Sequence, residues 1–312
     1  MTEPAHPLAQ APSSVVERLR RSASSFFLSE GPVTPVVAFR VFLALWLFGF
    51  WAPRVPHVWE LYCRPVLRHV HKAVKWLEHP LPPWWLMQAT ILVLLALLIG
   101  FACSRRPRVF HVLVFGPMCV LFAFDTLMPR AYGGLAFIQL AFLFLAPYDQ
   151  LRDDDGAIIE GPVLGQRFLQ LQFSSVYLFT VPAKLYGGQG WLDGSVLWKT
   201  FESPRYGDWL FSHWFEIPLW ACKAACYGTL IAELYIAIGL WFARTRLQAM
   251  VLCICLHTAM TLTLRVSLLF PTLMIGHLLL FLTDDEWARI LDWWSRRRPG
   301  WWPKRAARLA AS

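Results

Sequence analysis

Charged side chains are scarce in this 312-residue sequence, where Asp, Glu, Lys and Arg together make up 16%. A typical soluble domain has about 25%. Hydrophobic residues reach 57%, and the mean hydropathy is +0.45. Length alone would allow two soluble domains, but a chain with so few charges cannot keep two such surfaces hydrated. The composition therefore excludes an ordinary soluble protein and predicts an all-α fold, a polytopic transmembrane helical bundle.

Acidic residues are the rarer charge, with 20 Asp and Glu against 29 Lys and Arg. The resulting net charge of +9 does not indicate nucleic-acid binding, because the cations lie in loops and tails between apolar runs. That distribution is typical of membrane topology. The expected partner is therefore the lipid bilayer, and no nucleic acid is expected.

Metal-binding and secretion signals are also lacking. The seven cysteines show no metal-ligand spacing, and most lie in apolar runs, where a thiol behaves as a small hydrophobe. We therefore predict no metal site and no disulfide framework. The arginines of the N-terminal tail are not followed by a short apolar core with a cleavage site, so this tail is not a signal peptide.

Apolar runs of membrane-spanning length are abundant, and they predict about eight spans. The spans lie near residues 35–52, 84–102, 109–126, 132–147, 167–182, 218–242, 247–264 and 266–282. Residues 53–83, between the first two spans, carry apolar side chains at helical spacing and predict an amphipathic helix on the membrane surface. The chain thus divides into an N-terminal tail (1–34), a transmembrane domain (35–282) and a basic, Trp-rich C-terminal tail (283–312), which is expected to lie on an anionic leaflet.

The cations also predict the orientation. With eight spans both termini share one side, which carries 16 Lys and Arg against 10 on the other side. The positive-inside rule then places both tails in the cytoplasm. The chain is expected to cross the membrane many times, with the loop after residue 183 facing outward.

Residues 167–204 combine an apolar helix with many hydrogen-bonding side chains. The apolar run is expected to end at Pro182, two residues before Lys184, and flexible glycines then lead to Trp191-Leu192-Asp193-Gly194. A lysine at this position has two interpretations. It reaches water by snorkelling, or it is desolvated and acts as a base. Tyr177, Trp191 and Asp193 nearby favour the base.

The pattern R-x-L-Q-L-Q…V-Y-x-F…A-K-L…W-L-D-G, which starts at Arg167, resembles the horizontally transferred transmembrane (HTTM) domain. This domain forms the membrane part of vitamin K-dependent γ-glutamyl carboxylases and also occurs alone in bacterial proteins. The resemblance thus implies a bacterial inner (cell) membrane as the location. The resemblance extends from Val33 to Leu282. It implies a lyase in which Lys184, the lysine of A-K-L, deprotonates vitamin K hydroquinone. In that reaction oxygen converts the hydroquinone to an epoxide, and a strong base takes a proton from a peptide glutamate before CO2 adds.

The resemblance also implies the other site residues. His257 in C-L-H-T-A matches a histidine of the family and is expected to be catalytic together with Lys184. A core histidine bonded to a backbone carbonyl is the alternative for His257. Tyr177, Trp191 and Gln170 are expected to bind the cofactor, which is reduced vitamin K or another quinol.

Two charges inside apolar spans require a partner. Arg40 lies in the first span and Glu233 in the sixth. An unpaired arginine at the centre of a membrane helix costs about 2.5–3.5 kcal/mol. We therefore predict a buried structural ion pair between Arg40 and Glu233, with snorkelling of Arg40 as the alternative.

Two departures from the carboxylase pattern leave a second function open. The family carries an Asn-Asn-His segment before the fourth span, whereas residues 128–133 here contain no histidine. The carboxylases also have an extramembrane domain that helps to bind protein substrates, and only residues 283–312 follow the last span here. The alternative is a non-catalytic membrane partner that helps a small secreted peptide to mature or to cross the membrane. Both functions imply a small secreted peptide or protein as partner or substrate.

Overall fold

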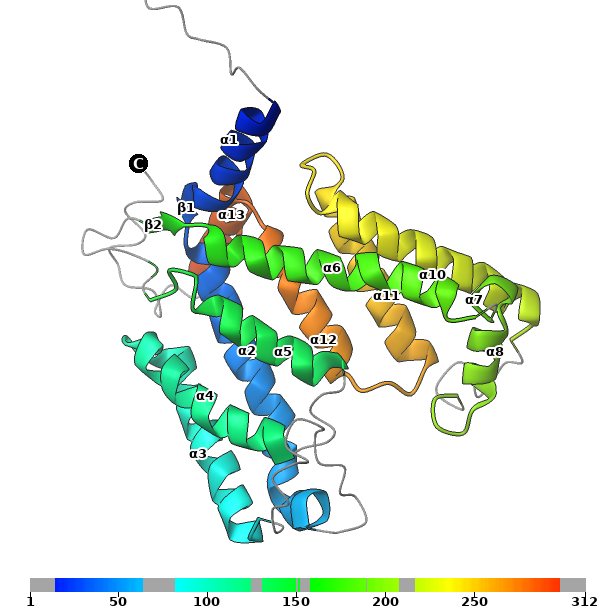
Figure 1. Ribbon diagram of the computed structural model, residues 1–312, viewed down its shortest axis with the longest axis horizontal. Helices are drawn as coiled ribbons and strands as arrows, with labels where there is room; N and C mark the ends of the chain where they lie inside the picture. The colour runs from blue at the N-terminus through cyan, green and yellow to red at the C-terminus, as the bar shows by residue number, and fades with distance from the viewer. Residues whose placement is uncertain are drawn as a thin grey trace, which may run out of the picture.

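The computed structural model describes residues 15–63, 82–124, 131–149, 151, 158–188, 190–207 and 217–297. Within these ranges the chain is all-α except for one short antiparallel ladder, which confirms the predicted fold class (Figure 1). The predicted surface helix of residues 53–83 falls mostly outside the described residues, as do residues 128–130 of the segment without a histidine. Before that gap, Ala52–His57 (η1) is a 3-10 helix and Trp59–Cys63 (η2) is a π-helix.

Five helical stretches in the described part of the chain are long and apolar enough to cross a membrane. They are Thr34–His57 (α2, Thr34–Trp51, continued by η1), α3 (Trp84–Cys103), α4 (Pro107–Phe124), α10 (Leu219–Gly239) and α11 (Arg246–Thr263). Their lengths of 18 to 24 residues match the roughly 20 that a bilayer core needs. Prolines directly precede or begin several of them, where the missing N–H costs nothing.

The other three predicted spans also form helices, but length and hydropathy alone do not mark them as spans. α5 (Ala131–Leu143) and α12 (Leu269–Gly276), which the 3-10 helix η5 (His277–Phe281) extends, are short and apolar. α6 (Leu164–Tyr186) is long enough, with 23 residues, but it carries several polar side chains. The fold thus has helices at all eight predicted positions and five clear candidate spans among its described residues.

The predicted end of the fifth helix at Pro182 is wrong, because α6 continues through this proline to Tyr186. Pro182 lacks the N–H that would bond to the carbonyl of the preceding turn, which is a local cost. The contacts of Lys184, described below, hold the following turn in place. The loop expected after residue 183 also contains two short helices, α7 (Gly190–Asp193) and α8 (Ser195–Glu202).

α6 and α10 lie side by side and antiparallel, and α11 packs on α10 (Figure 1). α12 packs between α11 and α2, and α3 and α4 form a hairpin that packs on α2. The largest fully buried side chains include Trp51, Phe39 and Phe173. In contrast, the outer faces of α3, α4, α10 and α11 expose many leucines, isoleucines and valines. Such faces suit contact with lipid tails rather than water.

The two terminal helices gather at one end of the bundle (Figure 1). The strands β1 (Glu30–Pro32) and β2 (Glu160–Pro162) pair just before α2 and α6 begin. α1 (Val15–Leu28) packs on α6, and α13 (Asp284–Arg297) packs on α2. The helices α7 and α8 lie at the opposite end of α6 (Figure 1). Both ends of the described chain therefore lie on the same side, away from Lys184.

Candidate functional site

One face of α6 carries the polar side chains that join it to its neighbours. Residues spaced three or four apart share a helical face. The members of this face are Gln170, Ser174, Tyr177, Thr180 and Lys184. Their partners lie on α10, α11, η5 and the turn after α10. The polar groups that lower the hydropathy of α6 are thus buried contacts inside the bundle.

A salt bridge joins the last turn of α6 to α10. The ammonium of Lys184 contacts Oε1 of Glu233, and the two side chains are only 19% and 10% exposed. The hydroxyl of Thr180 lies 3.3 Å from Oε2 of the same carboxylate. On its other side the ammonium lies 4.5 Å from the ring centre of Trp191, a cation–π contact. The lysine that the sequence marked is therefore held between a carboxylate and an indole.

The predicted ion pair between Arg40 and Glu233 is wrong. Arg40 is 6% exposed, and its two terminal nitrogens lie 3.3 Å from the carbonyl oxygen of Tyr148 and 3.4 Å from that of Ala102. Ala102 belongs to the last turn of α3, where carbonyls lack intrahelical partners and the helix dipole is negative. The prediction considered only carboxylates as partners for a buried cation, whereas backbone carbonyls at the end of α3 and in the segment after α5 supply the acceptors.

Tyr177 and His257 form a second buried cluster at the interface of α6 and α11. The tyrosine hydroxyl lies 2.7 Å from Nε2 of His257 and 3.4 Å from Sγ of Cys253. All three residues are at most 3% exposed. Nδ1 of His257 has no hydrogen-bond partner among the described residues. The alternative of a histidine bonded to a backbone carbonyl is therefore not what the structure contains.

Cys253 is the member of this cluster that the sequence analysis missed. It was assigned to apolar packing together with the other cysteines of the apolar runs. The available signal was its position four residues before His257, which places both side chains on one face of α11. A thiol, a phenol and an imidazole therefore meet at one point inside the bundle.

A cavity of about 290 Å³ opens beside Lys184. Its lining residues are Thr180, Ala183, Lys184, Gly187, Gly188, Gly190, Trp191 and Val196. Tyr177 and His257 are not among them. The two residues predicted to be catalytic therefore lie apart, Lys184 at this cavity and His257 in the buried cluster that begins one turn of α6 away. Thr180 connects the two, since its hydroxyl also lies 2.9 Å from the carbonyl of Tyr177.

The Trp191–Gly194 motif positions the indole over the lysine. Oδ1 of Asp193 accepts a hydrogen bond of 2.8 Å from the backbone N–H of Ser195 at the start of α8, and this bond lowers the pKa of the exposed Asp193 carboxyl. Gly194 has φ = +84°, and a Cβ there would lie 2.5 Å from the backbone nitrogen of Lys223. Only glycine allows this turn to approach the start of α10 so closely.

Replacing Gly194 with alanine is therefore expected to lower the free energy of unfolding by about 2 kcal/mol, from the left-handed backbone together with the clash against α10. Gly188→Ala is the matched control, because its φ of +132° is also unfavourable but its Cβ would meet nothing within 4 Å. Thermal unfolding of the purified variants in detergent measures both. Equal losses for the two variants would show that the turn does not pack on α10 as described.

Gln170 does not reach the cavity. Its Nε2 donates to the carbonyl of Leu280 at 2.7 Å, and its Oε1 accepts from Arg167 at 2.9 Å. It lies about 21 Å from Lys184 along α6, at about 1.5 Å per residue. The structure thus brings Lys184 and Trp191 together at the cavity, joins Tyr177 to His257 next to it, and uses Gln170 to pack α6 on η5.

An all-α bundle with several helices of membrane-crossing length and lipid-compatible outer faces is an integral membrane protein. Residues 135–287 match the model of the HTTM domain. This match confirms the resemblance to the HTTM domain that was seen in the sequence. The matched range contains Lys184, Glu233 and His257 but not Arg40. No curated protein and no solved structure matches this chain.

Proposed function

We propose that this HTTM protein is a membrane enzyme similar to the vitamin K-dependent γ-glutamyl carboxylases, with Lys184 as its base. The observation that carries the proposal is the buried pair of Lys184 and Glu233 beside a cavity. Ionisable groups inside membrane helices are costly and commonly functional. A lysine that is held in place and borders a cavity is suited to proton transfer with a molecule bound there.

A lysine base needs an acceptor for the proton of its ammonium group. The Glu233 carboxylate contacts this ammonium and is suited to accept the proton. With the proton on the Glu233 carboxyl, Nζ of Lys184 has a free lone pair. The Thr180 hydroxyl lies at the second carboxyl oxygen of Glu233. A hydroxyl can donate to a carboxylate or accept from a carboxylic acid, so it can bond to Glu233 in both protonation states. The face of Trp191 holds the lysine side chain in position.

The cavity residues fit the head group of a quinol. The lining combines the indole of Trp191 and the apolar side chains of Ala183 and Val196 with one ionisable group. Its volume of about 290 Å³ is at the lower end of small-molecule sites, which suits an aromatic head group better than a long lipid tail. When bound, reduced vitamin K or a similar quinol would supply an oxidisable hydroxyl within reach of the lysine.

The test is carboxylation of a peptide by membranes that contain the protein. Reduced vitamin K, oxygen and CO2 are supplied with a small secreted protein encoded beside this one, and mass spectrometry detects the addition of CO2 to glutamate. Lys184→Ala is expected to lower the activity by at least about a hundredfold. Lys199→Ala is the matched control, since Lys199 is an exposed lysine on the neighbouring α8.

Loss of folding must be separated from loss of the base. The double variant Lys184→Met, Glu233→Leu removes both charges and leaves no buried ion unpaired. We expect it to fold and to be as inactive as Lys184→Ala. Undiminished carboxylation by either Lys184 variant, at the protein level of the unaltered chain, would refute the proposal.

We further propose that the protein lies in a bacterial inner membrane with both tails in the cytoplasm. The location of α1 and α13 at the same end of the bundle supports tails on one side. The excess of Lys and Arg on the loops of that side supports the cytoplasmic assignment. The cavity would then lie at the outer face, where a small secreted peptide can reach Lys184.

A non-catalytic partner of a secreted peptide remains the second candidate. It is favoured by the division of Lys184 and His257 between the cavity and the closed cluster. Here the Lys184–Glu233 pair would only hold α6 on α10. The same mass spectrometry separates the two functions, because a partner would leave the peptide mass unchanged while secretion of the peptide still depended on the protein.

A further inference from the structure

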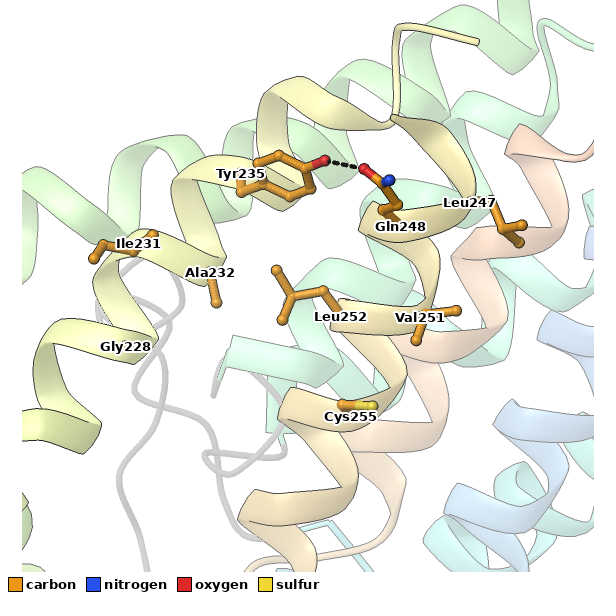
Figure 2. A pocket seen from close by; sticks show the side chains of 9 residues that line it. All are labelled: Gly228, Ile231, Ala232, Tyr235, Leu247, Gln248, Val251, Leu252 and Cys255. Carbon is orange, nitrogen blue, oxygen red and sulfur yellow. Dashed lines mark hydrogen bonds between the residues drawn. The ribbon is translucent and has the colours of Figure 1, made fainter. Parts of the chain in front are cut away.

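A second and larger hollow lies on the outer face of the bundle, between α10 and α11 (Figure 2). It has a volume of about 730 Å³, and its lining residues are Gly228, Ile231, Ala232, Tyr235, Leu247, Gln248, Val251, Leu252 and Cys255. We refer to this set as the α10–α11 groove. Figure 2 shows the two helices closest where Tyr235 bonds Gln248 and further apart towards Gly228 and Cys255. The hydroxyl of Tyr235 donates to Oε1 of Gln248 at 2.7 Å and closes that end.

The walls of the groove are apolar and open to the surroundings. Ile231 is 70% exposed, Leu247 66% and Val251 52%. Both helices have the length and hydropathy of membrane spans, so these side chains lie at the depth of lipid tails. An apolar hollow at that depth fills with hydrocarbon, since water would find almost no hydrogen-bond partner there.

Cations lie at the closed end of the groove. The turn between α10 and α11 carries Arg244, which is exposed, and Arg246 begins α11. Arg244 makes no hydrogen bond or ion pair with the described residues, whereas Arg246 lies 4.0 Å from Glu286. The positive end of the α11 dipole is at the same turn. The groove thus has a hydrocarbon-like body and a positively charged end, as an anionic phospholipid requires.

We propose that the α10–α11 groove binds one acyl chain of an anionic phospholipid, whose head group lies at Arg244. A flexible chain follows the taper towards Tyr235 and Gln248. A helix from a partner or a second copy is about 10 Å wide and does not fit a groove that narrows to a hydrogen bond. The site is separate from the Lys184 cavity and does not depend on the proposed function.

Native mass spectrometry of the purified protein with phosphatidylglycerol tests the groove. Gly228→Leu adds an apolar side chain to it at a position where a Cβ meets nothing within 4 Å. Gly49→Leu is the matched control, being an exposed glycine of α2 with the same free space. We expect one bound phosphatidylglycerol per chain, about tenfold weaker binding in Gly228→Leu and no change in Gly49→Leu. Tenfold corresponds to about 1.4 kcal/mol.

The head-group position is tested with Arg244→Gln and with phosphatidylcholine as the zwitterionic probe. We expect the unaltered protein to prefer phosphatidylglycerol, and Arg244→Gln to lose about fivefold for this lipid alone. Equal phosphatidylglycerol binding by the unaltered protein and Gly228→Leu would overturn the proposal. A dimer that Gly228→Leu converts to a monomer would also overturn it, and would assign the groove to a second copy.

Discussion

Replacing Glu233 with leucine is expected to lower the free energy of unfolding by about 3–5 kcal/mol, because the ammonium of Lys184 then stays buried without its carboxylate. The two side chains are 19% and 10% exposed, so water screens the charge only weakly. The ring of Trp191 remains in contact with the ammonium, but such a contact contributes only about 0.5–2 kcal/mol. Titration with SDS in mixed micelles measures the loss, with Glu202→Leu, at an exposed residue of α8, as the control.

The double variant Lys184→Met, Glu233→Leu distinguishes a stranded charge from a damaged interface. It replaces both charges with apolar groups of similar size, and we expect it to recover most of the stability that Glu233→Leu loses. The summed losses of the two single variants should therefore exceed the loss of the double variant. A double variant no more stable than Glu233→Leu would show that the pair does not join α6 to α10.

Replacing Arg40 with leucine is expected to cost about 3 kcal/mol, for a different reason. The arginine donates to the carbonyls of Ala102 and Tyr148, and leucine would leave both oxygens unpaired in an apolar setting. The stem of the side chain also packs in the core. Arg40→Lys is expected to retain only part of the stability. Its ammonium can bond to one of the two carbonyls but lacks the forked guanidinium that reaches both. The same SDS titration measures both variants.

The double variant Arg40→Leu, Glu233→Leu separates this arrangement from an Arg40–Glu233 ion pair. Because Arg40 and Glu233 have different partners, their losses should add to within about 0.5 kcal/mol. A direct ion pair would instead make the double variant much less harmful than the sum of the single variants. A strong coupling between Arg40 and Glu233 would therefore contradict the structure.

The partners of Arg40 and Glu233 show what the depth of a residue within its span predicts and what it does not. Apolar surroundings correctly indicated that Arg40 and Glu233 each need a partner. Depth along each helix did not identify the partner, since it ignores which helices are neighbours. α6 packs on α10, so Lys184 is the cation that contacts Glu233, and α3 ends beside α2, so the carbonyl of Ala102 accepts from Arg40. Helix neighbours are a property of the packed bundle.

The sequence by itself determined the features that depend on local composition. Long apolar runs specify helices because a backbone in lipid must satisfy its own hydrogen bonds, and this set the all-α class and the positions of the helices. The A-K-L and W-L-D-G motifs marked Lys184 and Trp191, which do meet at a cavity.

Only the tertiary structure decided the features that arise between helices. α6 continues through Pro182 because Glu233 and Trp191 hold Lys184, a gain that no local propensity contains. Cys253 joins Tyr177 and His257 because α11 turns that face towards α6, and the α10–α11 groove exists because the two helices diverge. Each of these depends on contacts between segments far apart in the chain, and such contacts leave no periodic or compositional signal within any one segment.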